Sequence, residues 1–170
     1  MTDPFAKWPT QAARSAFYGD PAGVGGRVNP KWEAANLVRV HFPWRAVLAW
    51  DTRTVVASAR VHRLCAESLG RVFEAIWAAA GRKQQAIDAW GMSLYGGGFE
   101  YRPVRGGRGL SSHSWGCAVD FDPQRNGFGD TTPHFAQAHE VLRAFEAEGW
   151  TWGGMWSKPD GMHWQAARVR

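Results

Sequence analysis

Two short segments of the 170-residue chain concentrate side chains that can bind a metal ion or move a proton. The first runs from Ser111 to Asp120 and contains His113, and the second, DGMHW at 160–164, contains His163. A catalytic zinc site in a hydrolase takes three nitrogen or oxygen ligands from the protein and leaves a fourth position for water. His113, Asp120 and His163 offer such a set, for one Zn²⁺ per chain.

A further carboxylate, Asp160, lies three residues before His163. Zinc lowers the pKa of a bound water to about 7, so a nearby carboxylate suffices to take its proton and later to pass a proton to the leaving amine. Spacing alone leaves another interpretation open, in which these are separate surface histidines and capping aspartates. The combined pattern predicts an open hydrolytic zinc site with Asp160 as the general base.

Strands are expected to bring these donors together. The segment CAVDFD at 117–122 alternates in polarity, which is typical of a half-buried strand. One face carries Cys117, Val119 and Phe121, and the other carries Ala118, Asp120 and Asp122. We expect His113 on the loop entering this strand, where Gly116 permits a close backbone approach, and His163 on a neighbouring strand, MHWQA at 162–166. Asp122 is expected to end the strand or to orient His113.

Three helices are predicted from apolar periodicity. The longest spans about 56–80 and ends at Gly81, with an apolar face of Val61, Leu64, Cys65, Leu69, Val72, Phe73, Ile76 and Trp77. A shorter one runs from Arg82 to Trp90 and ends at Gly91. The third begins with Thr132 as its N-cap and Pro133 in its first turn; it packs through Phe135, Ala138, Leu142 and Phe145 and ends at Gly149.

The remaining segments are predicted to be strands and loops. LVRVHF and AVLAW form two β runs broken at Pro43, and the stretch at 99–110 forms a strand and turn. Residues 1–35 are an irregular lead-in that packs on the core through Trp8, Phe17 and Tyr18. Helices and strands alternate without repeated βαβ units, so we expect one α+β domain over 1–170, with its catalytic core at 55–165.

Composition restricts the class of protein. An apolar content of 45% with 21% charged residues indicates a globular protein, and a net charge of +5 favours anionic partners such as nucleic acid, anionic lipid or an acidic cell-wall polymer. No basic run is interleaved with aromatic residues, so we expect no nucleic-acid binding. No stretch is apolar enough to span a membrane. The first 20 residues lack the apolar region of a Sec signal peptide, and we expect a monomer.

The other cysteines and histidines are expected to be structural. Cys65 and Cys117 match no C-x-x-C pattern, so each is interpreted as a small buried side chain, and a disulfide between them stays open. The histidines outside the motif are expected to be structural or solvent-facing; they are His41, His62, His134 and His139.

The motif S-x-H-x-x-G-x-A-x-D at 111–120, followed by D-x-x-H at 160–163, resembles the M15 peptidase family. This family comprises D-alanyl-D-alanine carboxypeptidases and dipeptidases and the L-alanyl-D-glutamate endopeptidases used as phage endolysins. The similarity covers about 55–164. Two segments, 99–126 and 148–164, look most like the endolysin branch. Two departures are Asp160, where many relatives have Glu, and Trp164, where Phe is commoner.

The resemblance implies zinc on His113, Asp120 and His163, with Asp160 as the base. It also implies that Ser111 and Arg102 hold the substrate, Arg102 by pairing with a carboxylate or the developing oxyanion. The implied fold is the small α+β fold of D,D-peptidases and the Hedgehog signalling domain, with an antiparallel sheet flanked by helices. Separately, the Gly-Trp-x-Trp-Gly-Gly segment at 149–154 and the following Trp156 lie before the second motif. Trp152 and Trp156 are expected to line the substrate groove, the alternative being that these tryptophans belong to the core.

The leading hypothesis is therefore a zinc-dependent peptidoglycan peptidase that cuts the stem peptide next to a D-amino acid, as an endolysin-type L-alanyl-D-glutamate endopeptidase. One alternative is a D-alanyl-D-alanine carboxypeptidase, which needs a pocket that closes over a terminal carboxylate. Another is a non-catalytic zinc-holding cell-wall-binding module, although such a module has no need of Asp160. Without a Sec signal, the protein is expected to act on the cell wall after release in phage or prophage lysis.

Overall fold

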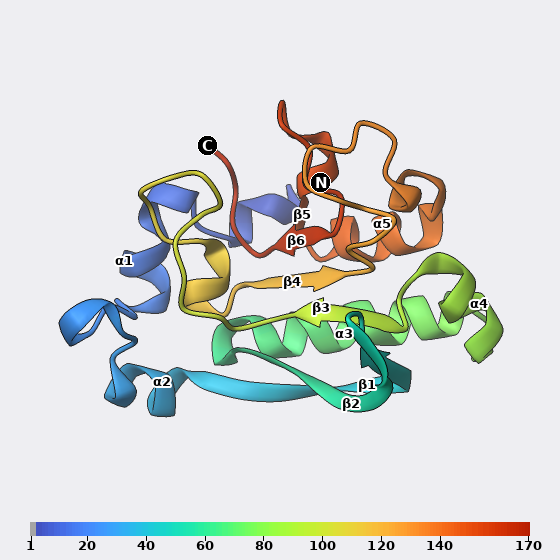
Figure 1. Cartoon of the computed structure of the whole chain (residues 1–170), viewed down its shortest axis with the longest axis horizontal. Helices are drawn as coiled ribbons and strands as arrows, with labels where there is room; N and C mark the ends of the chain where they lie inside the picture. Colours follow the sequence, from blue (N-terminus) through green and yellow to red (C-terminus); the bar gives the residue numbers. More distant parts are fainter. Residues whose placement is uncertain (1–2) are drawn as a thin grey trace.

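The computed structural model describes residues 3–170, which form one mixed six-stranded sheet flanked by helices (Figure 1). The strand order is β2-β1-β3-β4-β6-β5, with bounds β1 Leu37–Leu48, β2 Asp51–His62, β3 Leu94–Gly97, β4 Ala118–Phe121, β5 Thr151–Trp152 and β6 His163–Gln165. The α-helices are α1 Arg14–Tyr18, α2 Pro30–Asn36, α3 Arg63–Ala79, α4 Gln84–Trp90 and α5 His139–Ala147. The predicted α+β class is confirmed. The sheet is not antiparallel throughout, because β1 and β3 run parallel.

A long hairpin of β1 and β2 forms one side of the sheet. The two predicted runs are one strand, β1, in which a register irregularity between His41 and Ala46 accommodates Pro43. The helix predicted from Val56 was wrong over its first residues, which form β2 and pair with β1. Val55 and Val56 are β-branched and fit a strand better than a helix, and pairing with β1 decides between the two.

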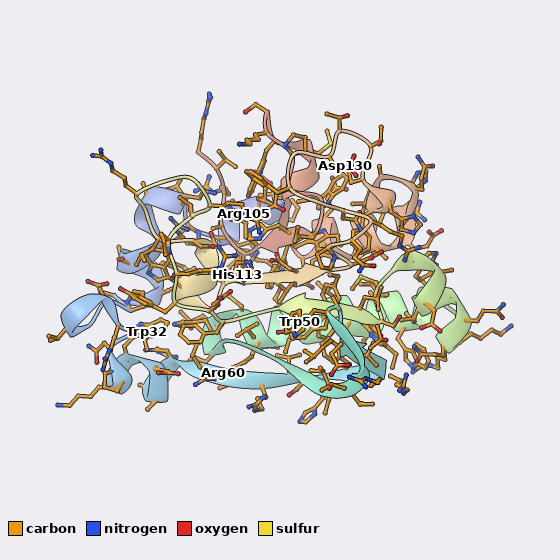
Figure 2. All side chains as sticks on the ribbon, viewed as in Figure 1. Trp32, Trp50, Arg60, Arg105, His113 and Asp130 are labelled. Carbon is orange, nitrogen blue, oxygen red and sulfur yellow. The ribbon has the colours of Figure 1, made fainter. Side chains whose placement is uncertain are left out.

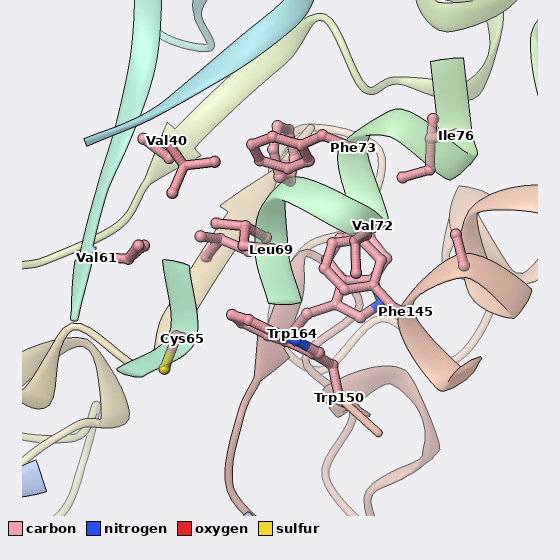
Figure 3. Packing of buried hydrophobic residues seen from close by; sticks show 14 of the residues in the cluster. Val40, Val61, Cys65, Leu69, Val72, Phe73, Ile76, Phe145, Trp150 and Trp164 are labelled. Carbon is pink, nitrogen blue, oxygen red and sulfur yellow. The ribbon is translucent and has the colours of Figure 1, made fainter. Parts of the chain in front are cut away.

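Helix α3 carries much of the core. It begins after His62, whose ring accepts a hydrogen bond from the amide of Leu64. Most of its predicted apolar face is buried, namely Cys65, Leu69, Val72, Phe73 and Ile76. Leu64 is 41% exposed, so its prediction on this face is wrong. These side chains pack between the hairpin, at Val40 and Val61, and a second group at Phe145, Trp150 and Trp164 (Figure 3). The helix thus joins the hairpin to the part of the chain that contains the second motif.

The bounds of two other helices differ from those predicted from the sequence. Helix α4 ends at Gly91 in the left-handed region, as predicted. The helix predicted from Thr132 is a short 3-10 turn, His134–Gln137, followed by α5, and the amide of Thr132 bonds to Asp130 in a local turn instead of starting a helix. Residues 99–110 form a loop closed by one bridge between Pro103 and Leu110, and the strand β3 precedes them.

The lead-in contains short helices and reaches the core from both of its ends. Trp8 and Tyr18 are buried as predicted, whereas Phe17 is 42% exposed. The ring of His62 donates from Nε2 to the carbonyl of Tyr18, and burial lowers the pKa of His62 to about 4. Cys65 and Cys117 are buried free thiols. Within residues 3–170, no helix combines the length and apolarity required to cross a bilayer.

Glu148 ties the lead-in to two helices. Its carboxylate accepts hydrogen bonds from Lys7, Ser68 and Arg71 at 2.8 Å each. Burial opposes its ionisation, but these donors outweigh burial and lower the pKa of Glu148 to about 2. A carboxyl whose pKa is lowered by folding stabilises the fold above its ordinary pKa, and that contribution is lost as the pH falls through the folded value.

We expect Glu148→Gln to lower the free energy of unfolding at pH 6–7 by about 1 kcal/mol, a value reduced for solvent screening of a partly exposed network. The difference from wild type should shrink as the pH falls from 4.5 towards 2, and denaturant unfolding at several pH values measures it. Glu146→Gln, on the exposed side of α5, is the control. A Glu148→Gln deficit that is the same at pH 2.5 and pH 7 would contradict this role.

Candidate metal centre

Strand pairing brings the two sequence motifs together. Asp120 on β4 lies directly across from His163 on β6, and Gly97 on β3 pairs with Asp120 from the other side. His113 lies on a 3-10 turn, Ser112–Trp115, that immediately precedes β4. Gly116 follows in the left-handed region at φ 67°, and a Cβ there would lie 2.8 Å from the amide nitrogen of His62. Glycine at 116 therefore lets the turn sit against β2 and presents His113 to Asp120.

The three predicted ligands form one compact group. Oδ1 of Asp120 lies 3.1 Å from Nε2 of His113 and 2.9 Å from Nδ1 of His163. One donor atom from each of the three residues lies within 4.8 Å of the other two, and all three side chains are largely buried. Figure 2 shows His113 beside the start of β4. This is the spacing expected of three ligands around one ion.

The hydrogen bond of His113 indicates which of its nitrogens faces the group. Nδ1 donates to the carbonyl of Gly98 at 2.6 Å, so the proton resides on Nδ1. Nε2 is therefore a lone-pair donor, and it is buried without a hydrogen-bond partner. A buried lone pair beside a carboxylate is unfavourable unless a cation lies between them. The donor set thus fits a metal ion.

The electrostatics of Asp120 and His163 lead to the same conclusion. Burial opposes the charged form of both groups. The two histidines nevertheless lower the pKa of Asp120 far below its ordinary range, and hydrogen bonding to Asp120 raises the pKa of His163. A metal ion held by these residues would supply positive charge to the same carboxylate and would displace protons from its ligands, which is the usual coupling between ligation and proton release.

A cavity of about 150 Å³ opens over the group and contains most of the other predicted residues. Asp160 lines it, and its Oδ1 is buried without a partner. Burial raises the pKa of Asp160 above its ordinary value. Trp156 also lines the cavity, with its ring centroid 5.5 Å from that of His163 and its indole nitrogen unpartnered. Two polar atoms without protein partners therefore lie at the cavity beside the three donors.

Arg102, Ser111 and Trp152 are placed differently from one another. Arg102 lines the cavity, but its Nε donates to Glu100 at 2.9 Å. Ser111 also lines it, while its side chain caps the turn by accepting from the amide of His113. Trp152 lies outside this cavity; it lines a separate apolar one with Trp150 and donates from its indole to the carbonyl of Gly161.

Asp122 does not contact His113. It ends β4 with a left-handed backbone at φ 45°, and its Oδ2 accepts from Arg125 at 2.6 Å. Its expected role at the end of the strand is thus observed, whereas the carbonyl of Gly98 orients His113. A carbonyl in this role could not have been identified from residue types, because every residue has one.

Sequence spacing also did not indicate a group of hydrogen-bonded side chains next to His163. Gln165 lies two residues after His163 on β6, and its Oε1 is 3.1 Å from Nε2 of that histidine. Ser112 donates to the same oxygen, and Arg14 from the lead-in donates to Ser112. The two-residue period of a strand could have indicated Gln165. Nothing local could have indicated Arg14.

A buried group of two histidines and one carboxylate at the base of a cavity, with a further carboxylate nearby, is typical of a metallohydrolase. Residues 105–166 match the sequence profile of an M15 peptidase family described as D-alanyl-D-alanine carboxypeptidase. The match confirms the resemblance to the M15 peptidases over the segment that contains all three donors and Asp160, and it supports a peptidase of this family. The chain matches no curated protein and no solved structure.

Zinc is expected to stabilise the protein through these three donors. At a free concentration about a thousand times the dissociation constant, binding adds about 4 kcal/mol and raises the melting temperature by roughly 10 °C. Asp120→Ala should abolish this shift, and Asp160→Asn should retain it, because Asp160 lies outside the donor group. Calorimetry of metal-free protein with and without zinc measures the effect. An equal shift in Asp120→Ala would place the ion elsewhere.

Proposed function

We propose that this protein is a zinc-dependent peptidase that hydrolyses peptidoglycan stem peptides next to a D-amino acid, as an endolysin-type L-alanyl-D-glutamate endopeptidase. The observation that carries the endopeptidase assignment is the presence of a cavity on each side of the donor group. The cavity over Asp160 is lined by Asp120 and His163. A second one, of about 430 Å³, is lined by Asp120 and His113.

The second cavity leaves room for a chain that continues past the metal position. Its walls are Trp50, Phe99 and Glu100, and its floor is the glycine run 96–98. A Cβ at Gly97 would meet no atom within 4 Å, so no side chain covers the strand at this residue. β1 pairs with β3 only as far as Tyr95, and a strand segment of glycines allows another backbone to approach closely. A site built for a terminal carboxylate would be expected to close on one side of the metal, and this one is open on both.

The two cavities differ in the charge of the side chains that line them. The cavity over Asp160 is lined by Arg14, Arg102 and Arg105, whereas the Trp50 side contributes one charged side chain besides the donors, Glu100. Arg105 and Trp50 lie on opposite sides of His113 (Figure 2). A guanidinium suits a carboxylate through its planar fork. This asymmetry supports a substrate that places its acidic part, such as a free carboxylate of a stem peptide, on the arginine side.

The residues have separable tasks in such a reaction. Zinc held by His113, Asp120 and His163 would supply Lewis-acid polarisation and lower the pKa of a water molecule. Asp160 accepts a proton from the attacking water at its unpartnered Oδ1 and delivers it to the leaving amine. Its raised pKa suits both steps, because the carboxyl must be ionised first and protonated later.

Substrate binding is assigned to residues around this centre. Arg102 pairs with a substrate carboxylate when it leaves Glu100, and Ser111 keeps the turn that carries His113 in place. Trp156 offers its free indole N–H to a substrate carbonyl. Trp152 contributes only by buttressing Gly161, next to Asp160. We assign the catalytic core to about 55–165 of a single domain, acting as a monomer on the cell wall after release during phage or prophage lysis.

The second candidate is a D-alanyl-D-alanine carboxypeptidase, which the description of the matching family favours. The two candidates differ in the termini that they create. Digestion of purified peptidoglycan by the zinc-loaded protein, followed by mass spectrometry, separates them. We expect new L-alanine carboxyl and D-glutamate amino termini. Release of only terminal D-alanine would establish the carboxypeptidase, and zinc binding without any cleavage would refute a peptidase.

Asp160→Asn is expected to lower kcat by roughly 10²–10⁴-fold, because it removes proton transfer at an otherwise intact site. Zinc content, measured by elemental analysis, should stay at one ion per chain. Asp88→Asn, at an exposed carboxylate on α4, is the matched control. Full activity in Asp160→Asn with zinc bound would assign the base to another residue.

Trp50 is 69% exposed at the turn between β1 and β2, and it offers an aromatic wall to a passing chain. We expect Trp50→Ala to raise KM for an intact stem peptide roughly 3–10-fold, the value of one aromatic contact. Trp50→Phe should restore most of the affinity. Met155→Ala, an exposed apolar residue outside both cavities, is the control. An unchanged KM in Trp50→Ala would remove the Trp50 side from the substrate cleft.

A further inference from the structure

A chain of buried and partly buried hydrogen bonds links the lead-in to the metal centre. Nη1 of Arg14 donates to Oγ of Ser112 at 2.7 Å, and that hydroxyl donates to Oε1 of Gln165 at 2.8 Å. The same Oε1 lies 3.1 Å from Nε2 of His163. On its other side, Nε2 of Gln165 donates to the carbonyl of Ala167 at 2.9 Å. Ser112 and Gln165 are 4% and 1% exposed, so water cannot easily replace a missing partner.

Both ends of this chain have fixed polarity. A guanidinium can only donate, so Arg14 obliges the hydroxyl of Ser112 to accept on that side and to direct its own proton to Gln165. A backbone carbonyl can only accept, so Ala167 obliges Gln165 to turn its NH₂ group outward. The opposite orientation of the amide would place two acceptors against each other at Ala167. The two ends together therefore direct Oε1 of Gln165 at the histidine.

The orientation of Gln165 decides the tautomer of His163. With an acceptor 3.1 Å from Nε2, the neutral ring must carry its proton on Nε2, because the other tautomer would oppose two lone pairs. Nδ1 then presents its lone pair beside Asp120, at 2.9 Å from Oδ1. Nδ1 is thus the nitrogen of His163 that faces the carboxylate of the donor group. Gly98 performs the corresponding task for His113.

We propose that Gln165 is a positioning residue that holds His163 in the tautomer required for zinc ligation, and that Arg14 of the lead-in, acting through Ser112, fixes the orientation of Gln165. The proposal rests on the zinc site of the proposed function. It makes the lead-in part of the metal centre, even though none of its residues is a ligand. The guanidinium of Arg14 is further held over the ring of Trp115, at 4.2 Å from the centroid, so its position does not depend on Ser112 alone.

Zinc affinity tests the proposal without relying on activity. Gln165→Leu keeps a similar volume but removes the acceptor, and we expect zinc affinity in a chelator competition to fall roughly 10–100-fold, as for other residues that orient metal-bound histidines. Gln165→Glu retains an acceptor for Nε2 and should bind zinc more tightly than Gln165→Leu. Gln137→Leu, at an exposed glutamine, is the control. A folded Gln165→Leu variant with wild-type zinc affinity would overturn the role of Gln165.

The link to Arg14 is tested separately. Arg14→Met keeps an apolar stem against Trp115 but cannot donate, whereas Arg14→Lys can. We expect zinc affinity to fall in Arg14→Met and to recover in Arg14→Lys, measured at a temperature at which the metal-free forms of all three proteins are folded. Equal zinc affinity in wild type and Arg14→Met would show that Arg14 does not orient Gln165 through these hydrogen bonds.

The tautomer itself is visible in the ¹⁵N shifts of the imidazole in zinc-loaded protein. Nε2 of His163 should be protonated and Nδ1 metal-bound, and the reverse assignment would overturn the proposal. A wild-type protein that binds no zinc would instead refute the proposed function, so the two failures are distinguishable.

Discussion

The carboxylate of Asp120 is the group on which the arrangement of the site depends. A buried carboxylate is costly unless opposite charge and hydrogen bonds compensate it. Here the compensation comes from two imidazoles, His113 from the turn before β4 and His163 from the facing strand. Each imidazole is held by an acceptor on its far side, Gly98 for one and Gln165 for the other. The registers of β3, β4 and β6 can thus be understood as the means of placing two imidazoles, each with its own acceptor, around one carboxylate oxygen.

The sequence was sufficient for the parts of the site that local periodicity controls. Alternation along CAVDFD placed Asp120 opposite the core face, and the short spacing from Asp160 to His163 placed both at one cavity. The start of α3 was misjudged because Val61 also fits a helical period, and only pairing with β1 makes it a strand residue. Gly98 and Arg14 were missed because their roles arise from contacts between distant segments.

The lead-in at residues 3–35 supports the metal centre through its contacts. Its composition is that of an irregular segment, yet Tyr18 bonds to the carbonyl of Ala166, Arg168 bonds to Pro9, and Arg14 reaches Ser112. Side chains and backbone of the lead-in are therefore fastened to the residues that directly follow β6 and to the turn that carries His113. A description limited to the matched segment at 105–166 would omit this support.

The parallel contact between β1 and β3 is short. Only Val47 with Leu94 and Leu48 with Tyr95 are paired across it, while the hairpin on one side has long pairing with two register irregularities. The sheet consequently has a seam, across which α3 is the main brace (Figures 1 and 3). Amide protons along this seam would exchange through smaller openings than those deep in the hairpin. The hairpin supports the donor group at the end of β2, where the amide of His62 donates to the carbonyl of Gly116. The turn between β1 and β2 lies at the opposite end of the hairpin, so opening at the seam beside that turn would leave this support of His113 in place.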